Sequence, residues 1–394
     1  MHRLRNGVKN YDWGSPDAIP QFLGAERPGT PVAEVWIGTH PLSPSATVDE
    51  AGERPLSEVS GDLPFMVKIL AADRPLSLQV HPSRSQAERG FDREEELGIP
   101  LDAPQRVYKD RNHKPEMVYA LTTFDSLIGF RPTAEILRVL GPLDTSLSQR
   151  LADDLRADPG FASIVRRIEW LLTEPIDPAE VRLIVDACRR LSAMSVDIKR
   201  AYQTAVEIAE YYPDDIGVVI SLMLNRMTLQ PGEAAYLETG VIHAHLKGLC
   251  LEVMASSDNV LRAGLTTKHI DTAGLVACLQ SGMARVARVT PDFVDYDTEV
   301  FSPAGGGFAL AVTQISAAAP EGVELVRSDG SVLICTGGDV VVTTDAGEKH
   351  ALARGESLYI ARTDRGATVH GLGEVAQAYV PPSRALRSRL VDMV

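Results

Sequence analysis

The spacing of hydrophobic residues changes twice along the chain, and this change limits the possible folds more strongly than any other feature. Residues 1–90 contain short apolar runs between glycines and prolines, such as AEVWIGTHP and PFMVKILAA, which is typical of strands in a β-sandwich or barrel. Residues 91–112 are charged and irregular, which predicts a surface helix or flap, and strand character returns at residues 115–130. Apolar residues then recur at helical spacing as far as residue 212, and short strand-like runs return from 213 onward. The sequence therefore predicts a mainly β protein with one helical insertion.

The insertion carries two clear helical signals. In SIVRRIEWLL, Ile164, Ile168 and Leu171 recur on one face of a helix. The segment DPAEVRLIVDACRRL opens on Asp177 and Pro178, a capping residue followed by the proline that helices accept in their first turn. We expect these apolar stripes to form a hydrophobic core and to carry no chemistry.

The length of 394 residues favours two or three domains. We divide the chain into a discontinuous β domain of residues 1–132 and 213–290, a helical domain of residues 133–212, and a C-terminal β-sandwich domain of residues 291–394. The last of these shows strands separated by glycine turns but no catalytic pattern. We expect it to pack against the catalytic domain.

Charge and cysteine usage exclude several classes of function. The net charge of −14 and a pI of about 5.2 argue against nucleic acid or anionic membranes as partners. The four cysteines form no C-x-x-C pair, which is consistent with a reducing cytosol. The longest apolar run, GVVISLML, is shorter than the ~18 residues that span a bilayer, and the N-terminus lacks the apolar stretch of a signal peptide. We expect a cytoplasmic protein; its oligomeric state stays open, with a monomer expected.

Polar residues alternate with apolar ones in the stretch LSLQVHP. As an extended strand it places three aliphatic side chains on one face, and Ser77, Gln79 and His81 on the other. The stretch HKPEM repeats the arrangement, with Lys114 and Glu116 two residues apart. Strand faces that carry an amide, an imidazole and a carboxylate are not explained by packing alone.

A third stretch, GVIHAHLKG, places His243 and His245 two residues apart. Two imidazoles, a carboxylate and an amide oxygen suit a first-row divalent ion, and Zn²⁺ with an open coordination position fits them. The spacing leaves the choice between His243 and His245 open, because only the fold can bring distant strands together.

Charged residues follow the histidine strand. Arg262 and Lys268 lie in SSDNVLRAGLTTKHID, and their side chains suit a phosphate or an oxyanion. Glu252 lies among apolar neighbours, where a carboxylate needs a cationic or metal-site partner. Trp13, in NYDWGS, offers an aromatic wall.

Three long runs resemble the type I mannose-6-phosphate isomerase (phosphomannose isomerase) family, a zinc-dependent cupin family. They are PFMVKILAADRPLSLQVHPSRSQA, NHKPEMVYALTTFDSLIGFRP and GVIHAHLKGLCLEVMASSDNVLRAGLTTKHID. NYDWGS and EVWIGTHP resemble the N-terminal pattern of the family. The resemblance covers nearly all of residues 1–275 in order, whereas the C-terminal part is similar only in its β character.

The resemblance implies a cupin-type, jelly-roll fold with β-sandwich domains and an α-helical domain. It implies the reversible isomerisation of mannose 6-phosphate to fructose 6-phosphate, which feeds mannose and GDP-mannose metabolism. It also implies one Zn²⁺ per chain and a small phosphosugar as partner. The implied metal ligands are Gln79, His81, Glu116 and His243.

The resemblance further implies that Arg262 is the catalytic arginine. It places Lys114, Glu252, Ser77 and Lys268 along the pocket. We add Lys114 and Glu252 to the catalytic candidates, and His245 and Trp13 to the substrate-binding ones. The position of His245 is commonly a tyrosine in that family.

The chemistry of an aldose–ketose isomerisation fits these residues. A proton must move between neighbouring carbons, through an enediol that carries negative charge on oxygen. A neutral amide ligand such as Gln79 leaves a divalent ion with a net positive charge that stabilises this oxygen. Glu252 and Lys114 both remain candidates for the base. Arg262 suits either the enediolate or the phosphate.

Two other functions are compatible with the residues. A cupin dioxygenase or another sugar isomerase would use Fe²⁺ or Mn²⁺ at a site of histidines and a carboxylate. A non-catalytic sugar-binding cupin would keep the pocket without turnover. Arg262 and Lys268, which suit a phosphate, favour the phosphosugar isomerase over the first. The joint presence of Lys114, Glu252 and Arg262 argues against the second, since simple binding needs no such set.

Overall fold

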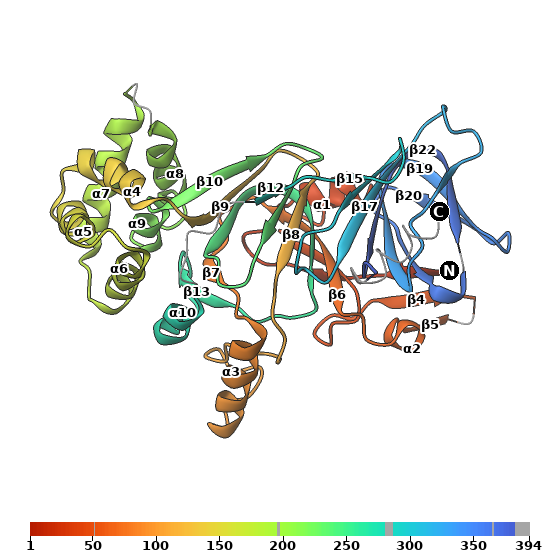
Figure 1. Ribbon diagram of the computed structural model, residues 1–394, viewed down its shortest axis with the longest axis horizontal. Helices are drawn as coiled ribbons and strands as arrows, with labels where there is room; N and C mark the ends of the chain where they lie inside the picture. Colours follow the sequence, from red (N-terminus) through yellow and green to blue (C-terminus); the bar gives the residue numbers. More distant parts are fainter. Residues whose placement is uncertain (51, 195–197, 280–286, 365, 383–394) are drawn as a thin grey trace, which may run out of the picture.

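The computed structural model describes residues 1–50, 52–194, 198–279, 287–364 and 366–382. Two large sheets lie side by side, and a group of helices lies at the end of the molecule away from the second sheet (Figure 1). The predicted class, mainly β with a helical insertion, is thereby confirmed. None of the helices in the described ranges is long and apolar enough to cross a membrane.

Sheet I contains the strands that carry the predicted metal ligands. Its main path runs β14-β11-β8-β12-β6-β3-β2, and β7, β9, β10 and β13 pair beside it. The bounds are β2 Gly7–Lys9, β3 Glu34–Ile37, β6 Phe65–Ala72, β7 Leu78–Val80, β8 Glu116–Ala120, β9 Phe124–Phe130, β10 Leu224–Leu229, β11 Ala234–Leu237, β12 His243–Ala255, β13 Leu261–Gly264 and β14 Ala287–Val289.

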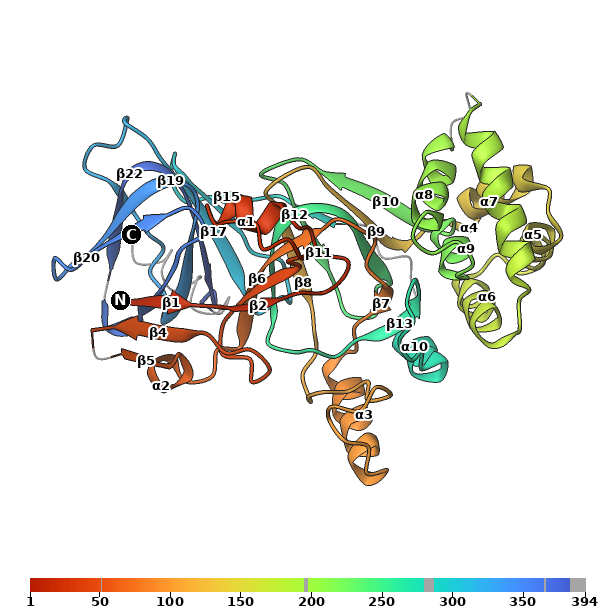
Figure 2. The same ribbon diagram turned by 180° about the vertical axis from the view of Figure 1, so that it is seen from behind.

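Sheet II draws strands from both ends of the chain. Its main path runs β15-β16-β17-β22-β19-β21-β1-β4-β5, with β18 on β22 and β20 on β19. Figure 2 shows β1, β4 and β5 beside the C-terminal strands. The bounds are β1 His2–Arg5, β4 Ala46–Asp49, β5 Gly52–Pro55, β15 Asp292–Phe293, β16 Thr298–Phe301, β17 Ala309–Ile315, β18 Val323–Glu324, β19 Gly330–Thr344, β20 Lys349–Ala353, β21 Ser357–Ala361 and β22 Ala367–Tyr379.

Strand β12 changes neighbours along its length. Its first residues pair with β7 and β9, and its second half, from Gly248, pairs with β6 and β8. Gly248 has a φ of 123°, and a Cβ there would lie 2.5 Å from the carbonyl oxygen of Thr123. Only glycine accepts this conformation and this close approach. The histidines and Glu252 therefore lie on two differently paired halves of one strand.

Side-chain alternation gives sheet I two different buried faces. Met117, Tyr119 and Leu251 pack with Leu310 and Val332 of sheet II in one hydrophobic core. The intervening residues of β8 and β12, such as Val118 and Cys250, belong to a separate core on the opposite face. The period of two predicted from the sequence thus separates the interface between the sheets from the face that carries Glu116.

The insertion folds as helices whose core, in which Ile164, Ile168 and Leu171 are buried, continues into strands β7, β9, β12 and β13 of sheet I. Asp177 caps its helix by accepting a hydrogen bond from the backbone N–H of Ala179. The bounds are α4 Thr133–Leu140, α5 Ser146–Ala157, α6 Phe161–Thr173, α7 Pro178–Ser192, α8 Lys199–Ala209 and α9 Gly217–Ser221; elsewhere lie α1 Ala18–Phe22, α2 Ser57–Ser60, α3 Arg84–Glu96 and α10 Thr272–Cys278, and two 3₁₀ turns, η1 Gly141–Leu143 and η2 Arg362–Asp364.

One local prediction is wrong. Strands do not resume directly at residue 213, because Gly217–Ser221 forms α9 and the next strand begins at Leu224. All five residues of α9 are buried, so the segment is a continuous apolar run. Such a run has no polar face from which a helical period could be recognised.

Candidate metal centre

Strand pairing aligns three of the predicted site residues in one row. Gln79 on β7 lies opposite His243 on β12, and Arg262 on β13 lies opposite Gln79 on its other side. Glu116 opens β8 and lies opposite Met254 of β12. The fold therefore brings four distant segments of sequence to one end of sheet I.

His81, Glu116 and His243 converge, with one ligating atom of each within 4.8 Å of the others. The Nε2 atom of His81 lies 3.2 Å from Oε1 of Glu116, and Nε2 of His243 lies 3.4 Å from Oε2 of the same carboxylate. The carboxamide of Gln79 approaches within 3.3 Å of His243 Nε2. All four predicted ligand side chains therefore face one point.

Backbone carbonyls orient both imidazoles. His81 Nδ1 lies 2.8 Å from the carbonyl oxygen of Asn259, and His243 Nδ1 lies 3.0 Å from that of Val241. A carbonyl only accepts, so each Nδ1 donates and each Nε2 keeps its lone pair toward Glu116. Metal-binding histidines are typically fixed in this way.

The donor set fits a divalent cation. Nε2 of His81 and both carboxylate oxygens of Glu116 are buried without a hydrogen bond of acceptable geometry. Burial lowers the pKa of His81 to about 4. Burial would raise the pKa of Glu116, but the nearby His81, Lys114 and His243 side chains hold it well below its usual range. Neutral imidazoles and an ionised carboxylate are the forms that metals bind.

Lys114 and Glu252 flank this group. The ammonium of Lys114 lies 3.1 Å from Oε1 of Glu116, and both side chains are buried. Glu252, His245 and Glu116 form a second group of ligating atoms within 4.8 Å of one another. His245 therefore has a different partner, Glu252, from those of His81 and His243, although it lies on the same strand as His243.

A buried chain of charges runs away from the metal centre. His245 Nε2 lies 3.2 Å from Oε1 of Glu252, and Lys68 Nζ lies 3.7 Å from Oε2. Lys68 also lies 3.3 Å from Oε1 of Glu34. Burial would lower the pKa of Lys68, but the two glutamates outweigh it and raise that pKa. Burial and Glu116 raise the pKa of Glu252, while Lys68 and His245 lower it overall.

Sequence reasoning gave no role to Lys68 or Glu34, although a signal was present. Lys68 interrupts the apolar strand PFMVKILAA, all of whose described β6 residues are buried. A lysine in such a strand requires a buried counter-charge. The ammonium of Lys68 also contacts the face of the Trp36 ring, with Nζ 4.7 Å from the ring centroid.

The predicted phosphate-binding residues lie beside an aromatic pair. Lys268 Nζ lies 5.7 Å from the ring centroid of Tyr11, which stacks on Trp13 at 5.6 Å. Burial and then Arg262 lower the pKa of Lys268. Trp13 packs partly against the core that includes Ala72, whereas Tyr11, which sequence reasoning left without a role, contacts Lys268. Ser77 immediately precedes β7, two residues from Gln79.

Asn259, another residue without a predicted role, ties two ligand segments together. Its carbonyl oxygen orients His81, and its side chain accepts from the N–H of Lys109 at 2.7 Å. The same amide donates to the carbonyl oxygens of Asp110 at 2.8 Å and Asn112 at 2.9 Å. The loop that leads into Lys114 and Glu116 is thereby fixed relative to β7.

Two sheets and this donor set define a metal-binding β protein of the cupin type. A family model described as "Phosphomannose isomerase type I, catalytic domain" matches residues 1–133. The chain is 35% identical over 398 residues to the mannose-6-phosphate isomerase of Escherichia coli K12, covering 96% of this chain and 99% of that protein. It is 30% identical over 405 residues to the Homo sapiens protein of that name, covering 91% and 92%.

A solved structure agrees with these relatives. Mannose 6-phosphate isomerase from Salmonella typhimurium, bound to its substrate fructose 6-phosphate and to zinc, superposes with a TM-score of 0.85 at 33% identity, covering 97% of this chain and 100% of that chain. The chain belongs to the type I phosphomannose isomerase family. The family predicted from the motif runs is confirmed.

Proposed function

We propose that the protein interconverts mannose 6-phosphate and fructose 6-phosphate with one zinc ion bound by Gln79, His81, Glu116 and His243. The observation that carries the proposal is the convergence of His81, Glu116 and His243 within 4.8 Å beside a buried lysine. The matches to mannose-6-phosphate isomerases over nearly the whole chain support it. They leave no reason to retain a dioxygenase or a non-catalytic cupin.

The ligands suit zinc in an isomerase. Zinc bound here would supply Lewis-acid stabilisation of negative charge on a substrate oxygen. Glu116 provides the only charged ligand of the four. Gln79 would coordinate through its amide oxygen, which occupies the place of Nε2 after a half turn of the carboxamide. The neutral amide keeps the local charge positive where the substrate becomes anionic.

We assign proton transfer to Glu252. Its pKa is lowered by Lys68 and His245 against the effects of burial and Glu116, so the side chain is available as a carboxylate that accepts a proton. Lys114 is held in its ion pair with Glu116 and would neutralise charge rather than remove the proton. His245 orients Glu252 through the contact at 3.2 Å.

We assign Arg262 to the enediolate and Lys268 to the phosphate. Arg262 lies opposite Gln79 in the sheet, which places it one strand from the ligands. Lys268 is exposed at the rim, over the Tyr11 ring. Ser77 and Trp13 would complete the pocket on the β7 side. An exposed lysine suits a phosphate that remains hydrated, whereas the half-buried guanidinium suits the reacting end.

We also propose a cytoplasmic monomer that serves mannose and GDP-mannose metabolism, with the three-domain division given above, although β1, β4 and β5 extend the sheet of the C-terminal domain. In that division the C-terminal domain packs against the catalytic one. Light scattering coupled to gel filtration tests the monomer.

A coupled assay tests the proposed function. Mannose 6-phosphate should be converted to fructose 6-phosphate by the zinc-loaded protein. Activity should disappear after chelation and return when zinc is added back. Conversion that persists in fully chelated protein would refute the metal requirement, and absence of conversion with zinc bound would refute the reaction.

A further inference from the structure

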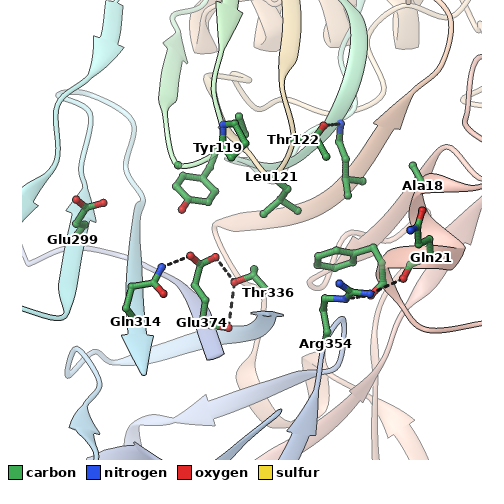
Figure 3. Close-up of a pocket in the computed structure, with 15 residues that line it drawn as sticks. Ala18, Gln21, Tyr119, Leu121, Thr122, Glu299, Gln314, Thr336, Arg354 and Glu374 are labelled. Carbon is green, nitrogen blue, oxygen red and sulfur yellow. Dashed lines mark hydrogen bonds between the residues drawn. The ribbon is translucent and has the colours of Figure 1, made fainter. Parts of the chain in front are cut away.

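A cavity separate from the candidate metal centre lies between the two sheets, on the side of β8 that faces away from Glu116. It has a volume of about 570 Å³. Figure 3 shows its walls: α1 and the β8 end of sheet I form one side, and strands of sheet II form the other. Tyr119 follows Glu116 by three residues on β8, so the two side chains point to opposite faces.

Two carboxylates line the sheet II side of the cavity. Glu374 accepts a hydrogen bond from Thr336 Oγ1 at 2.6 Å and another from the amide of Gln314. Glu299 lies beside them on β16. Neither glutamate forms an ion pair with any residue that the structure describes. Two half-buried negative charges thus face the cavity with only neutral donors nearby.

Tyr119 provides an independent sign of a ligand. The residue is 3% exposed, and its hydroxyl points into the cavity in Figure 3. Within the described ranges this hydroxyl has no hydrogen-bond partner. Burial, Glu374 and Glu299 all raise the pKa of Tyr119, so it remains a neutral phenol that needs a partner. Because Tyr119 lines the cavity, the hydrogen-bond partner of its hydroxyl must come from whatever occupies the cavity.

The cation across the cavity does not neutralise the carboxylates. Arg354 donates from Nε to the carbonyl oxygen of Phe22 and from Nη2 to that of Gln21, both at 2.9 Å. Its guanidinium lies over the Phe22 ring, 5.8 Å from the centroid. The part of the cavity opposite the two glutamates is therefore lined by the Phe22 ring and by aliphatic side chains such as Leu121 and Leu249.

We propose that the cavity binds a small organic ammonium compound. Its charged nitrogen would lie between Glu374 and Glu299 and donate to the Tyr119 hydroxyl, and its aliphatic part would lie against Leu121 and Leu249. An inorganic ion fits less well, because the groups of three ligating residues found in the described ranges all include Glu116 at the metal centre. The cavity is also far larger than one ion.

Isothermal titration calorimetry of the zinc-loaded protein with 1,4-diaminobutane tests the site. We expect saturable binding that Glu374→Gln or Glu299→Gln weakens by about tenfold or more, since each removes a charged hydrogen-bond acceptor. Glu169→Gln is the matched control, because it removes one exposed negative charge from α6. This control should bind like the wild type, and the melting temperature of both should rise with the diamine.

A third variant and three competing compounds distinguish this cavity from the substrate pocket and from non-specific binding. Tyr119→Phe keeps the ring on Phe301 and should weaken binding even if a glutamate variant fails to fold. Saturating fructose 6-phosphate should leave the affinity unchanged. The proposal is overturned if binding is absent, if the variants bind like the wild type, if fructose 6-phosphate displaces the diamine, or if butane-1,4-diol or Mg²⁺ binds as tightly.

Discussion

His245 and Glu252 contact each other although seven residues of one strand separate them, with Nε2 of the imidazole 3.2 Å from Oε1 of the carboxylate. An extended strand of that length would hold the two side chains roughly 20 Å apart. The contact exists because β12 turns at Gly248, where it exchanges β7 and β9 for β6 and β8. Glu252 is therefore oriented by a residue from the ligand half of the same strand.

This contact makes His245 a positioning residue for Glu252. We expect His245→Phe to lower kcat by about tenfold, as for the loss of one charged hydrogen bond, with little change in KM. His245→Tyr restores a donor, and tyrosine is the residue that the family resemblance associates with this position. The tyrosine variant should therefore recover most of the activity. Equal activity of the phenylalanine variant and the wild type would contradict the role.

Gln79→Glu tests the charge of the ligand set. The variant should retain zinc, because carboxylates bind it well, but a second negative ligand weakens stabilisation of an anionic intermediate. We expect kcat to fall roughly 10²–10³-fold, the size of losing one oxyanion-stabilising group. Metal analysis and steady-state kinetics check this. An unchanged kcat with zinc bound would show that the neutral amide is not needed.

Arg262→Ala should lower kcat by about 100-fold or more and leave the zinc content near that of the wild type. Arg262 pairs with Gln79 from the neighbouring strand β13, and within the described ranges its side chain forms no hydrogen bond or ion pair with His81 or His243. Arg190→Ala, at an exposed position of α7, is the control for loss of a positive charge. If the variant loses zinc together with activity, Arg262 stabilises the metal site and is not specific to the enediolate.

Asn259→Ala should destabilise the fold and loosen the metal centre together. It leaves the N–H of Lys109 and the carbonyl oxygens of Asp110 and Asn112 without their partner. We expect a loss of about 2–3 kcal/mol in the free energy of unfolding and roughly 10–100-fold weaker zinc binding. Urea unfolding and competition with a chelator measure the two effects. Zinc affinity equal to that of the wild type would show that the loop does not position the ligands.

Asp125 should make stability depend on pH in the acid range. Burial raises its pKa, but hydrogen bonds from Arg226, at 2.8 Å, and from Thr228 outweigh burial and lower it. A lowered folded-state pKa means stability that is present above the unfolded value of about 3.9 and lost as pH falls through the folded one. Because this carboxylate is partly exposed, the effect should be on the order of 1 kcal/mol.

Urea unfolding at neutral pH and near pH 3 checks the role of Asp125. Asp125→Asn should be less stable than the wild type at neutral pH, and the difference should shrink in acid. Asp102→Asn, at an exposed position, is the matched control. A difference that is constant with pH would assign the loss to packing rather than to the charge.

Most side chains of the candidate metal centre could be predicted from the sequence because alternation within each strand already separates polar from apolar side chains. Gln79 with His81, and Lys114 with Glu116, were recognisable within single short stretches. Asn259 was not, because its contacts join segments about 150 residues apart. The choice between the two histidines likewise depends on which strand each half of β12 pairs with, which no local spacing encodes.

The fold shows the same limit. Helical spacing identified α6 and α7, whereas α9 was missed because it is buried on every side. The assignment of β1, β4 and β5 to sheet II was not predicted, since pairing between the two ends of a chain depends on the whole topology. Local patterns specify elements, and long-range pairing specifies their neighbours.

The pairing of β1 with β21 has a consequence for biosynthesis. Strand β1 can pair with β4 soon after both are made, but its other edge finds β21 only when residues near position 360 have been made. At ordinary elongation rates of about 5–20 residues per second, the edge of β1 stays uncovered for tens of seconds. Sheet II can therefore close only after β21 and β22 have been made, and chaperones that shield nascent strands should influence the yield of this protein more than its final stability.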